Sequence, residues 1–412
     1  MVVAYVVSKN GKPLMPTRPS RARRMLKEGK AKCIRREPFT IKLTYETTEY
    51  TQSLTMGIDP GSSKLGVAVV NEKGEALYLS KVFIRNDIKK KMDRRRMYRR
   101  TRRNRLRYRP CRFDNRKNSR KEDRFSPTLT SKINSHIREI NFVKKILPIS
   151  KIILEKARFD TTAIEHSEVL INKWGYQRGA LYRYSNKREY VLARDKYTCV
   201  RCKSRHVRLE VHHVTPKSEG GSDDLDNLIT LCEFCHKNAH NHPKYYMYFG
   251  GTSKVKHATH MNSITKQLER ILDCEVTYGY ITKADRLKLG YAKSEAIDAA
   301  VIATEGREVT FLSEGVLYKR HVPRGDYRQT YGKRSEYRTI TGKQDGFRKH
   351  DKVKFQGEEC FIKQMRRIGT CTLSDIFDNK DSWKLNIKLN GLKRIESRSS
   401  CLMHFYVIFR KT

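Results

Sequence analysis

Two pairs of cysteines are the residues whose spacing points most directly to chemistry. Cys199 and Cys202 form one Cys-x-x-Cys pair, Cys232 and Cys235 form a second, and 29 residues separate the pairs. Four thiolates in two such pairs are typical of a tetrahedral structural Zn²⁺ site, which keeps no open coordination position. In a reducing compartment this pattern favours a metal site over disulfides. We therefore predict a structural zinc site.

Histidines and an asparagine lie between and after these pairs. They are His212, His213, Asn227, His236 and His240. Adjacent residues of a strand point to opposite faces, so His212 and His213 are expected to do different work. His236 and His240 are four residues apart and would share one face of a helix. A histidine that is neutral near pH 7 can act as a general base or as a metal ligand. A zinc ribbon that only binds is the alternative, but it would leave these residues without a purpose.

The order of these residues resembles the HNH, or ββα-metal, nuclease motif. The resemblance implies that His213 is the general base and that Asn227 holds its loop. It also implies that His212 and His236 bind one catalytic Mg²⁺, with His240 as a candidate third ligand.

Three carboxylates lie in ordinary contexts far apart in the chain. Asp59 follows an apolar run and precedes Pro-Gly, Glu155 ends the run Ile152-Ile-Leu-Glu155, and Asp298 lies in an alanine-rich helical segment. Each alone is typical of a turn, a strand end or a solvated helix face. Together their order resembles the RuvC form of the RNase H fold, in which such residues meet around two Mg²⁺. Two close cations need several oxygen ligands, which Mg²⁺ prefers.

One position departs from that resemblance. The family often carries a histidine three residues before the last aspartate, and Glu295 stands there in this chain. Glu295 would then be either a fourth carboxylate ligand or the mark of a weaker second nuclease site.

The charge of the chain indicates its partner. Its 412 residues include 88 Lys and Arg against 44 Asp and Glu, a formal net charge of +44. Such an excess repels itself unless a polyanion neutralises it, and nucleic acid is the first candidate. No run of 18 apolar residues is present, so we expect no transmembrane helix and no membrane partner. The expected location is the prokaryotic cytoplasm, in association with the nucleoid.

Residues 85–112 concentrate this charge. Lys and Arg occupy 15 of the 28 positions, and Asp87 and Asp93 are the acids there. The segment favours a helix but offers no apolar stripe to bury, so it is expected to bind phosphate. The candidate RNA-binding arginines are Arg94, Arg95, Arg96, Arg99, Arg100, Arg102, Arg103, Arg105 and Arg107.

The elements around these residues define seven expected segments. They are a basic module at 1–51, RuvC-like part I at 52–84, an Arg-rich bridge helix at 85–112, RuvC-like part II at 113–185, an HNH insert at 186–245, RuvC-like part III at 246–305, and a β-rich domain at 306–412. The expected fold class is therefore a multidomain α/β and α+β protein. In it an RNase H-like (RuvC) domain is split in three and holds an inserted ββα-metal domain.

This layout resembles the transposon-encoded IscB family, whose members are related to the type II CRISPR effector nucleases. Lys12-Pro-Leu-Met-Pro16 matches the PLMP module of that family, and Tyr176-Gln-Arg-Gly-Ala-Leu and Gly346-Phe-Arg-Lys-His-Asp-Lys-Val also look like family signatures. The resemblance implies an RNA-guided DNA endonuclease that uses a long structured omega RNA and acts as a monomeric protein in the ribonucleoprotein. The HNH site would cut the guide-paired strand and the RuvC-like site the displaced strand.

The C-terminal domain would then read a short motif beside the target in double-stranded DNA. Candidate reading residues are Lys363, Arg366 and Arg367. Two other functions compete with RNA guidance. One is a guide-free homing or junction-resolving HNH/RuvC-type endonuclease, and the other is a non-catalytic RNA-binding protein with relic nuclease sites.

Overall fold

The chain forms two compact units, each of which combines segments that are distant in sequence. The computed structural model describes residues 3–106, 124–156, 181–216, 223–241, 256–312, 315–323, 339–340 and 342–407. One unit comprises Met1–Lys91, Pro110–Ala157 and Ser263–Thr412, and the other comprises Met92–Arg109 and Arg158–Asn262. The molecule is thus a mixed α/β multidomain protein, as the sequence predicted.

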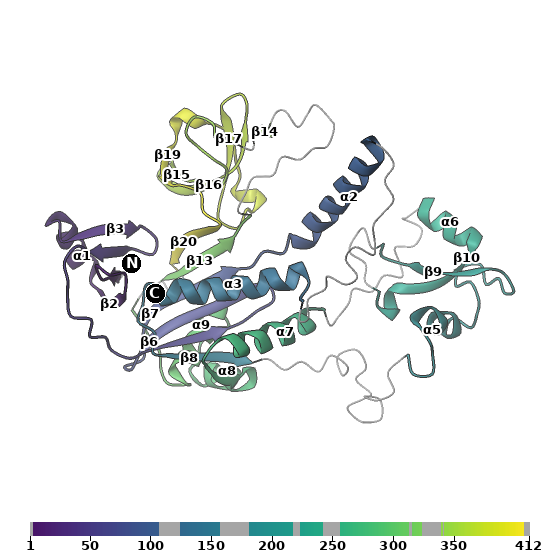
Figure 1. Cartoon of the computed structure of the whole chain (residues 1–412), viewed down its shortest axis with the longest axis horizontal. Coiled ribbons are helices and arrows are strands. Elements are labelled where there is room, and N and C mark those ends of the chain that lie inside the picture. Colours follow the sequence, from purple (N-terminus) through teal and green to yellow (C-terminus); the bar gives the residue numbers. More distant parts are fainter. Residues whose placement is uncertain are drawn as a thin grey trace. The chain divides into compact units, whose positions relative to one another are not determined.

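An eight-stranded sheet is the centre of the first unit (Figure 1). The strands β5, β6 and β7 form an antiparallel meander, and β8 and β11 then add in parallel beside β5. Apolar side chains fill the central strands, and Leu65, Val67 and Val69 of β6 are fully buried. The strand bounds are β5 Leu54–Asp59, β6 Lys64–Asn71, β7 Glu75–Phe83, β8 Lys151–Lys156, β11 Glu275–Tyr278, β12 Thr310–Phe311, β13 Gly315–His321 and β20 Cys401–Val407.

Helix α9 (Glu295–Thr304) lies directly on this sheet. Its alanines, with strand residues such as Ala68 and Leu79, form one continuous core cluster. Gly57 and Gly66 permit the close approach, because a Cβ at either would meet a backbone oxygen of the helix, at 2.1 Å and 1.8 Å respectively. The small residues of both elements therefore fix how near Asp298 comes to the strand ends.

A buried ion pair holds α3 (Pro127–Lys144) on the same sheet. The Lys319 ammonium donates to both carboxylate oxygens of Glu139, at 2.8 and 2.9 Å. Tyr78 and Ser80 donate to the same carboxylate, and the Lys319 nitrogen lies 3.5 Å from the centre of the Phe142 ring. Because every charge here has a partner, this polar group is stable in the core. Two further helices of the region are α7 (Lys256–Ile271) and α8 (Gly279–Lys288).

The N-terminal module is a four-stranded sheet with one helix. The strand order is β2-β1-β4-β3, and β1 and β4 are parallel. Ala22 of the helix packs into the core of this sheet beside Ala4 and Ile41. The element bounds are β1 Ala4–Val7, β2 Pro13–Thr17, α1 Pro19–Lys27, β3 Ala31–Arg35 and β4 Thr40–Leu43.

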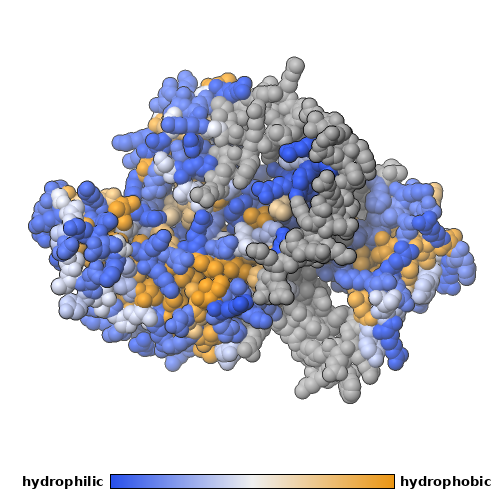
Figure 2. All heavy atoms as spheres, in the orientation of Figure 1, coloured by the Kyte–Doolittle hydropathy of each residue, from blue (hydrophilic) through white to orange (hydrophobic). Residues whose placement is uncertain are grey.

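The C-terminal residues form a separate six-stranded sheet and also return to the large one. In the six-stranded sheet the order is β18-β17-β16-β15-β19, with β14 beside β16, and Figure 2 shows mostly hydrophilic residues over this region. The bounds are β14 Thr339–Ile340, β15 Lys352–Phe355, β16 Glu358–Arg366, β17 Thr370–Ser374, β18 Lys384–Lys388 and β19 Lys393–Glu396.

The expectation that 306–412 form a single β-rich domain needs correction. The strands β12, β13 and β20 belong to the eight-stranded sheet, where β13 pairs in parallel with β7 and antiparallel with β20. Alternating apolar residues predict a strand but do not reveal its partner, which tertiary packing selects.

The second unit contains a small ββα arrangement. The strands β9 (Leu209–His213) and β10 (Leu228–Cys232) pair antiparallel, and α6 (Glu233–Asn241) follows at once. Helix α5 (Lys187–Arg194) packs on β10, and its N-cap Asn186 accepts a hydrogen bond from the amide of Glu189. Cys199, Leu231 and Ala239 belong to the hydrophobic core of this ββα arrangement.

The arginine-rich segment forms the helix α2 (Ile88–Leu106), and the division between the two units falls within it, after Lys91. None of its residues whose burial is described is buried. Across the described part of the chain, no helix combines the length and the apolar character needed to span a bilayer.

Candidate functional site

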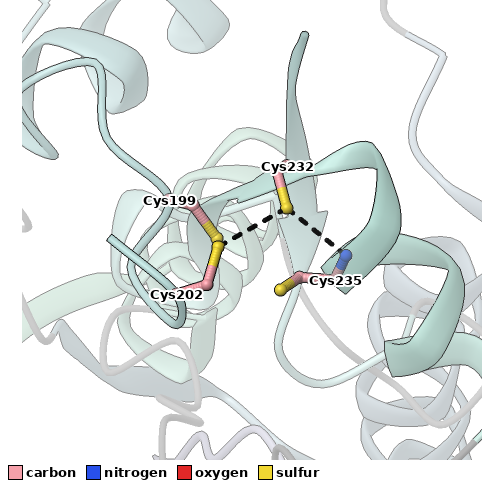
Figure 3. A group of neighbouring side chains, drawn as sticks. All are labelled: Cys199, Cys202, Cys232 and Cys235. Carbon is pink, nitrogen blue, oxygen red and sulfur yellow. Dashed lines mark hydrogen bonds between the residues drawn. The ribbon is translucent and has the colours of Figure 1, made fainter. Parts of the chain in front are cut away.

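The four paired cysteines converge at one end of the ββα arrangement (Figure 3). Their sulfurs all lie within 4.8 Å of one another, and the sulfurs of Cys202 and Cys232 are 3.7 Å apart. Thiolates bound to one tetrahedral Zn²⁺ at about 2.3 Å would be separated by about 3.8 Å. The donor set and its spacing therefore fit the predicted zinc site.

The surroundings of these thiols differ. Burial raises the pKa of Cys235 to about 12, whereas a hydrogen bond with Ser204 lowers the pKa of the exposed Cys202 to about 6. A buried thiol becomes a thiolate only when a cation offsets the cost of burying its charge. The cluster is thus suited to a metal and poorly suited to remain empty.

We expect Cys199→Ser to destabilise the ββα arrangement by several kcal/mol. A serine hydroxyl is a poor zinc ligand, and structural zinc supplies about 10–16 kcal/mol of apparent binding energy to small zinc-dependent folds. Zinc content per chain and thermal unfolding followed by circular dichroism measure the effect. Cys33→Ser, an exposed cysteine outside the cluster, is the control. An unchanged unfolding profile in zinc-free protein would contradict the assignment.

Three histidines form a second cluster, made by β9 and α6. The ligand nitrogens of His212, His236 and His240 all lie within 4.8 Å of one another, and the ring centres are 4.8 to 5.1 Å apart. Burial, followed by the nearby histidine charges, lowers the pKa of His212 to about 4. His212 is therefore neutral at physiological pH, as a metal ligand must be.

Glu210 supports this cluster and was not identified from the sequence. Its carboxylate lies 2.6 Å from Nδ1 of His236, which leaves Nε2 of that ring facing His240. A carboxylate that accepts the second N–H of a ligating imidazole fixes the ring orientation and its tautomer. The signal was present, since Glu210 lies two residues before His212 and so shares its face of the strand.

His213 points away from the cluster and contacts Asp223 instead. Its Nε2 lies 2.7 Å from a carboxylate oxygen of Asp223, and its side chain is 28% exposed. A carboxylate only accepts hydrogen bonds, so Nε2 carries a proton, and in the neutral ring Nδ1 is then the acceptor nitrogen. This ring is accordingly set up to take a proton through Nδ1. Asp223 was also not identified from the sequence, because ten residues separate it from His213.

Asn227 is fully buried and binds the segment that follows His213. Its carboxamide oxygen accepts from the amide of Thr215 at 2.8 Å, and its nitrogen donates to the carbonyl of Thr215 at 3.1 Å. Its own carbonyl accepts from the amide of Val214 at 2.9 Å. These are the contacts expected of a residue that holds the loop.

The three dispersed carboxylates converge on the eight-stranded sheet. Asp59 ends β5, Glu155 lies near the end of the adjacent parallel strand β8, and Asp298 is in the first turn of α9. Burial, and then the charges of Glu155 and Asp298, raise the pKa of Asp59 well above its usual range. Burial also raises the pKa values of Glu155 and Asp298. Such a group of carboxylates ionises fully only beside cations.

Cationic side chains border this carboxylate site. Nε of Arg286 lies 2.8 Å from Asp298, and Nζ of Lys81 lies 2.5 Å from Glu295. Burial acts to raise the pKa of Glu295, but the hydrogen bond and charge of Lys81 outweigh it and lower that pKa. Glu295 is thus near the site but already bound by a lysine, a contact that spacing alone did not reveal.

The carboxylate site is less compact than the two clusters in the ββα arrangement. Among the residues that the structure describes, the sets with all ligand atoms within 4.8 Å of one another are the four cysteines, the three histidines, and Glu37, Glu359 and His404. The last set surrounds the ammonium of Lys352, which lies 2.7 Å from each glutamate and supplies the cation itself.

The arginines of α2 are mostly exposed. Arg96 lies 3.1 Å from Asp93, and Arg103 is partly buried. The side chain of Arg105 and the whole of Arg107 lie outside the described residues, as does most of the Tyr176 signature. The exposed arginines are Arg94, Arg95, Arg96, Arg99, Arg100 and Arg102.

The three residues expected to read DNA differ in their surroundings. Lys363 lies 2.5 Å from Asp378 and 3.2 Å from the centre of the Trp383 ring. Arg366 donates to Asn386 at 2.5 Å, while Arg367 is exposed in the turn between β16 and β17.

Two family models match separate parts of the chain. Residues 4–179 match the family described as RRXRR protein, and residues 199–242 match HNH endonuclease. The run Arg99-Arg100-Thr101-Arg102-Arg103 of α2 has the pattern of the first description.

Three curated proteins share short regions with the chain. Anaredoxin from Nostoc sp. is 36% identical over 59 residues, 14% of this chain and 78% of that protein. The type IV methyl-directed restriction enzyme EcoKMcrA from Escherichia coli (strain K12) is 56% identical over 32 residues, 8% of this chain and 12% of the enzyme. The probable mobile endonuclease C of Enterobacteria phage T4 is also 56% identical over 32 residues, 8% and 15% of the two chains. The matches to the two endonucleases thus span a small part of their lengths.

Among solved structures, Streptococcus thermophilus Cas9 in complex with the GGAA PAM aligns over 50% of this chain and 30% of its own. The TM-score is 0.36 and the identity 14%. A second Streptococcus thermophilus Cas9 structure, with the AGGA PAM, gives a TM-score of 0.35 at the same identity.

The HNH match covers the ββα histidine cluster and supports a DNA endonuclease with an HNH domain. The RRXRR match precedes this domain, and together the two matches span more than half of the chain. The order of the two matches, RRXRR before HNH, fits the resemblance to the IscB family.

Proposed function

We propose that this endonuclease is guided by RNA. A long structured RNA pairs with one strand of double-stranded DNA, the HNH site cuts that paired strand, and the carboxylate site cuts the displaced strand. The observation that carries RNA guidance is α2, a 19-residue helix without a described buried residue, on the same chain as two chemically different candidate nuclease sites.

Helix α2 is suited to hold an RNA backbone. At about 1.5 Å per residue it is about 28 Å long, and exposed arginines lie around it. The planar guanidinium group binds phosphate oxygens in pairs, which favours arginine over lysine. A protein that holds a hybrid duplex by charge and shape can leave sequence recognition to base pairing. The net charge of +44 supports a large nucleic-acid partner.

In the HNH site, His213 acts as the general base. Its Nδ1 accepts a proton from the attacking water while Asp223 holds Nε2, and the buried Asn227 keeps the following loop in place. His212, His236 and His240 would hold the metal, which we propose is Mg²⁺. When bound, that ion stabilises the negative charge that develops on the phosphate and the leaving oxygen.

In the carboxylate site, Asp59, Glu155 and Asp298 would hold two Mg²⁺ in an RNase H-like (RuvC) domain. That domain would be split by α2 and by the HNH insert, and the division into sequence-distant segments supports this reading. Arg286 and Lys81 keep the outer carboxylates in place. The six-stranded C-terminal sheet would read the motif beside the target, with Lys363, Arg366 and Arg367 as the candidate residues.

Removal of RNA tests guidance directly. Protein purified with its nucleic acid, then stripped by high salt and ribonuclease, is expected to lose site-specific cleavage by at least about 100-fold, because a short protein-read motif cannot specify a site. Addition of the RNA recovered from the same preparation should restore cleavage, and a changed guide segment should move the cut. Sequencing of that RNA identifies the guide.

Undiminished cutting of the same sites by stripped protein would refute guidance and favour a guide-free HNH endonuclease. DNA binding without cutting by protein, RNA and Mg²⁺ together would favour a binding protein with relic sites.

A further inference from the structure

Two tyrosines stack at the junction between β11 and α8. Tyr278 ends β11 and Tyr280 is the second residue of α8. Their ring centres are 5.9 Å apart, and the ring planes differ by 10°. Parallel, offset rings at this distance are a favourable aromatic arrangement. Tyr280 is nevertheless 72% exposed, so the pair presents an open aromatic face to solvent.

The pair lies beside the carboxylate site. In the parallel register of β8 and β11, Thr277 is opposite Glu155 and Tyr278 is opposite Lys156. Between the tyrosines lies Gly279, where a Cβ would come within 2.9 Å of Oε1 of Glu155. The Cα atoms of Gly279 and Tyr280 are about 3.8 Å apart along the chain. An exposed ring thus emerges one residue from Gly279, where a side chain would collide with a proposed metal ligand.

The surroundings of the pair favour a nucleic-acid ligand. Lys283, one turn along α8, and Lys293, before α9, are both exposed. Exposed lysines attract a phosphate backbone, and an aromatic face accepts any base by stacking. The core side of α8 is supplied by residues such as Thr282 and Arg286, so Tyr280, which stacks on Tyr278, is not needed in the core.

We infer that Tyr280, supported by Tyr278, is a stacking platform for a base of the single DNA strand that enters the carboxylate site. The inference rests on the proposed nuclease function of that site. A base stacked on Tyr280 would hold the neighbouring phosphate against Asp59, Glu155 and Asp298. The platform binds any base, so it fixes how far the strand enters the carboxylate site without reading its sequence.

Strand-specific cleavage by the full ribonucleoprotein tests the platform. Tyr280→Ala is expected to slow cleavage of the displaced strand by roughly 5- to 100-fold, the range of one base–aromatic stack. Tyr280→Phe should retain most of the rate, whereas Tyr280→Leu should not, because stacking needs a ring rather than bulk. The paired-strand cut, made at the other site, is the internal reference for folding and RNA binding.

Leu287→Ala is the matched control, since this residue lies on the same helix and is 60% exposed. It should leave both rates unchanged. Asp59→Asn, tested in parallel, separates the stacking platform from the nuclease function of the carboxylate site. If Asp59→Asn abolishes displaced-strand cleavage and Tyr280→Ala does not affect it, the platform is refuted and the nuclease site stands. If neither variant affects it, the proposed function of the carboxylate site fails.

Discussion

Replacement of His213 by alanine is expected to abolish cleavage of the guide-paired strand and to leave the displaced strand cut. Loss of a positioned general base lowers the rate of such a step by about 10²- to 10⁴-fold. The structure also indicates which ring nitrogen would take the proton, because Asp223 binds Nε2 and leaves Nδ1 for that role. End-labelled DNA strands, analysed on denaturing gels over time, measure each cut separately.

His206→Ala provides the control for this experiment, because His206 is an exposed histidine of the same region and lies outside the cluster. It should cut both strands at the normal rate. Asp223→Asn should give an intermediate loss, since an asparagine still bonds to the ring but stabilises its protonated form less. Equal loss of both cuts in His213→Ala would show that the two sites are not independent.

Asp59→Asn should have the opposite pattern, with normal cutting of the paired strand and at least a 100-fold loss on the displaced strand. Asn keeps the volume but removes the charge that a two-metal site requires. The same charge is costly in metal-free protein, because burial and neighbouring carboxylates raise the pKa of Asp59. Asp59→Asn should therefore leave the thermal midpoint in EDTA unchanged or raise it, even though one activity is lost.

An exposed carboxylate near β11 serves as the comparison. Asp273→Asn removes one negative charge just before that strand and should change neither the cutting pattern nor the midpoint. An unaltered product pattern in Asp59→Asn would remove Asp59 from the catalytic machinery. A large fall in the EDTA midpoint would mean that the loss of cutting reflects folding rather than metal binding.

The two candidate nuclease sites are built in different ways. In the ββα arrangement, β9, β10 and α6 are consecutive or nearly so, and β9 and α6 supply all three clustered histidines. The carboxylate site instead assembles residues from 59, 155 and 298 through long-range strand pairing. The ligand atoms of the first site lie close together, and the carboxylates of the second site are more widely spaced.

Local spacing explains why the site in the ββα arrangement could be predicted from the sequence. Cys-x-x-Cys pairs, adjacent histidines on a strand and histidines four apart on a helix each have a geometry that follows from strand and helix periodicity. The structure brings all four cysteines together, and likewise His212, His236 and His240. The supporting partners Glu210 and Asp223 were missed, because an acidic residue near a histidine is common and its contact depends on side-chain direction.

Residue composition and local periodicity were enough to predict the charge-driven properties and the local elements. The charge excess, the arginine helix, the strands that carry Asp59 and Glu155 and the helix that carries Asp298 all follow from residue type and period. These features depend on neighbours within a few residues, so no knowledge of the fold is needed to predict them.

Which distant elements meet could not be predicted in this way and became clear from the folded chain. It placed β13 and β20 in the eight-stranded sheet, paired Glu295 with Lys81, engaged Lys363 with Asp378, and set Gly279 against Glu155. The physical reason is that alternating strands offer the same backbone hydrogen bonds to many partners. Side-chain volume, such as the glycines under α9, and the burial of each charge beside an opposite one then select the single arrangement.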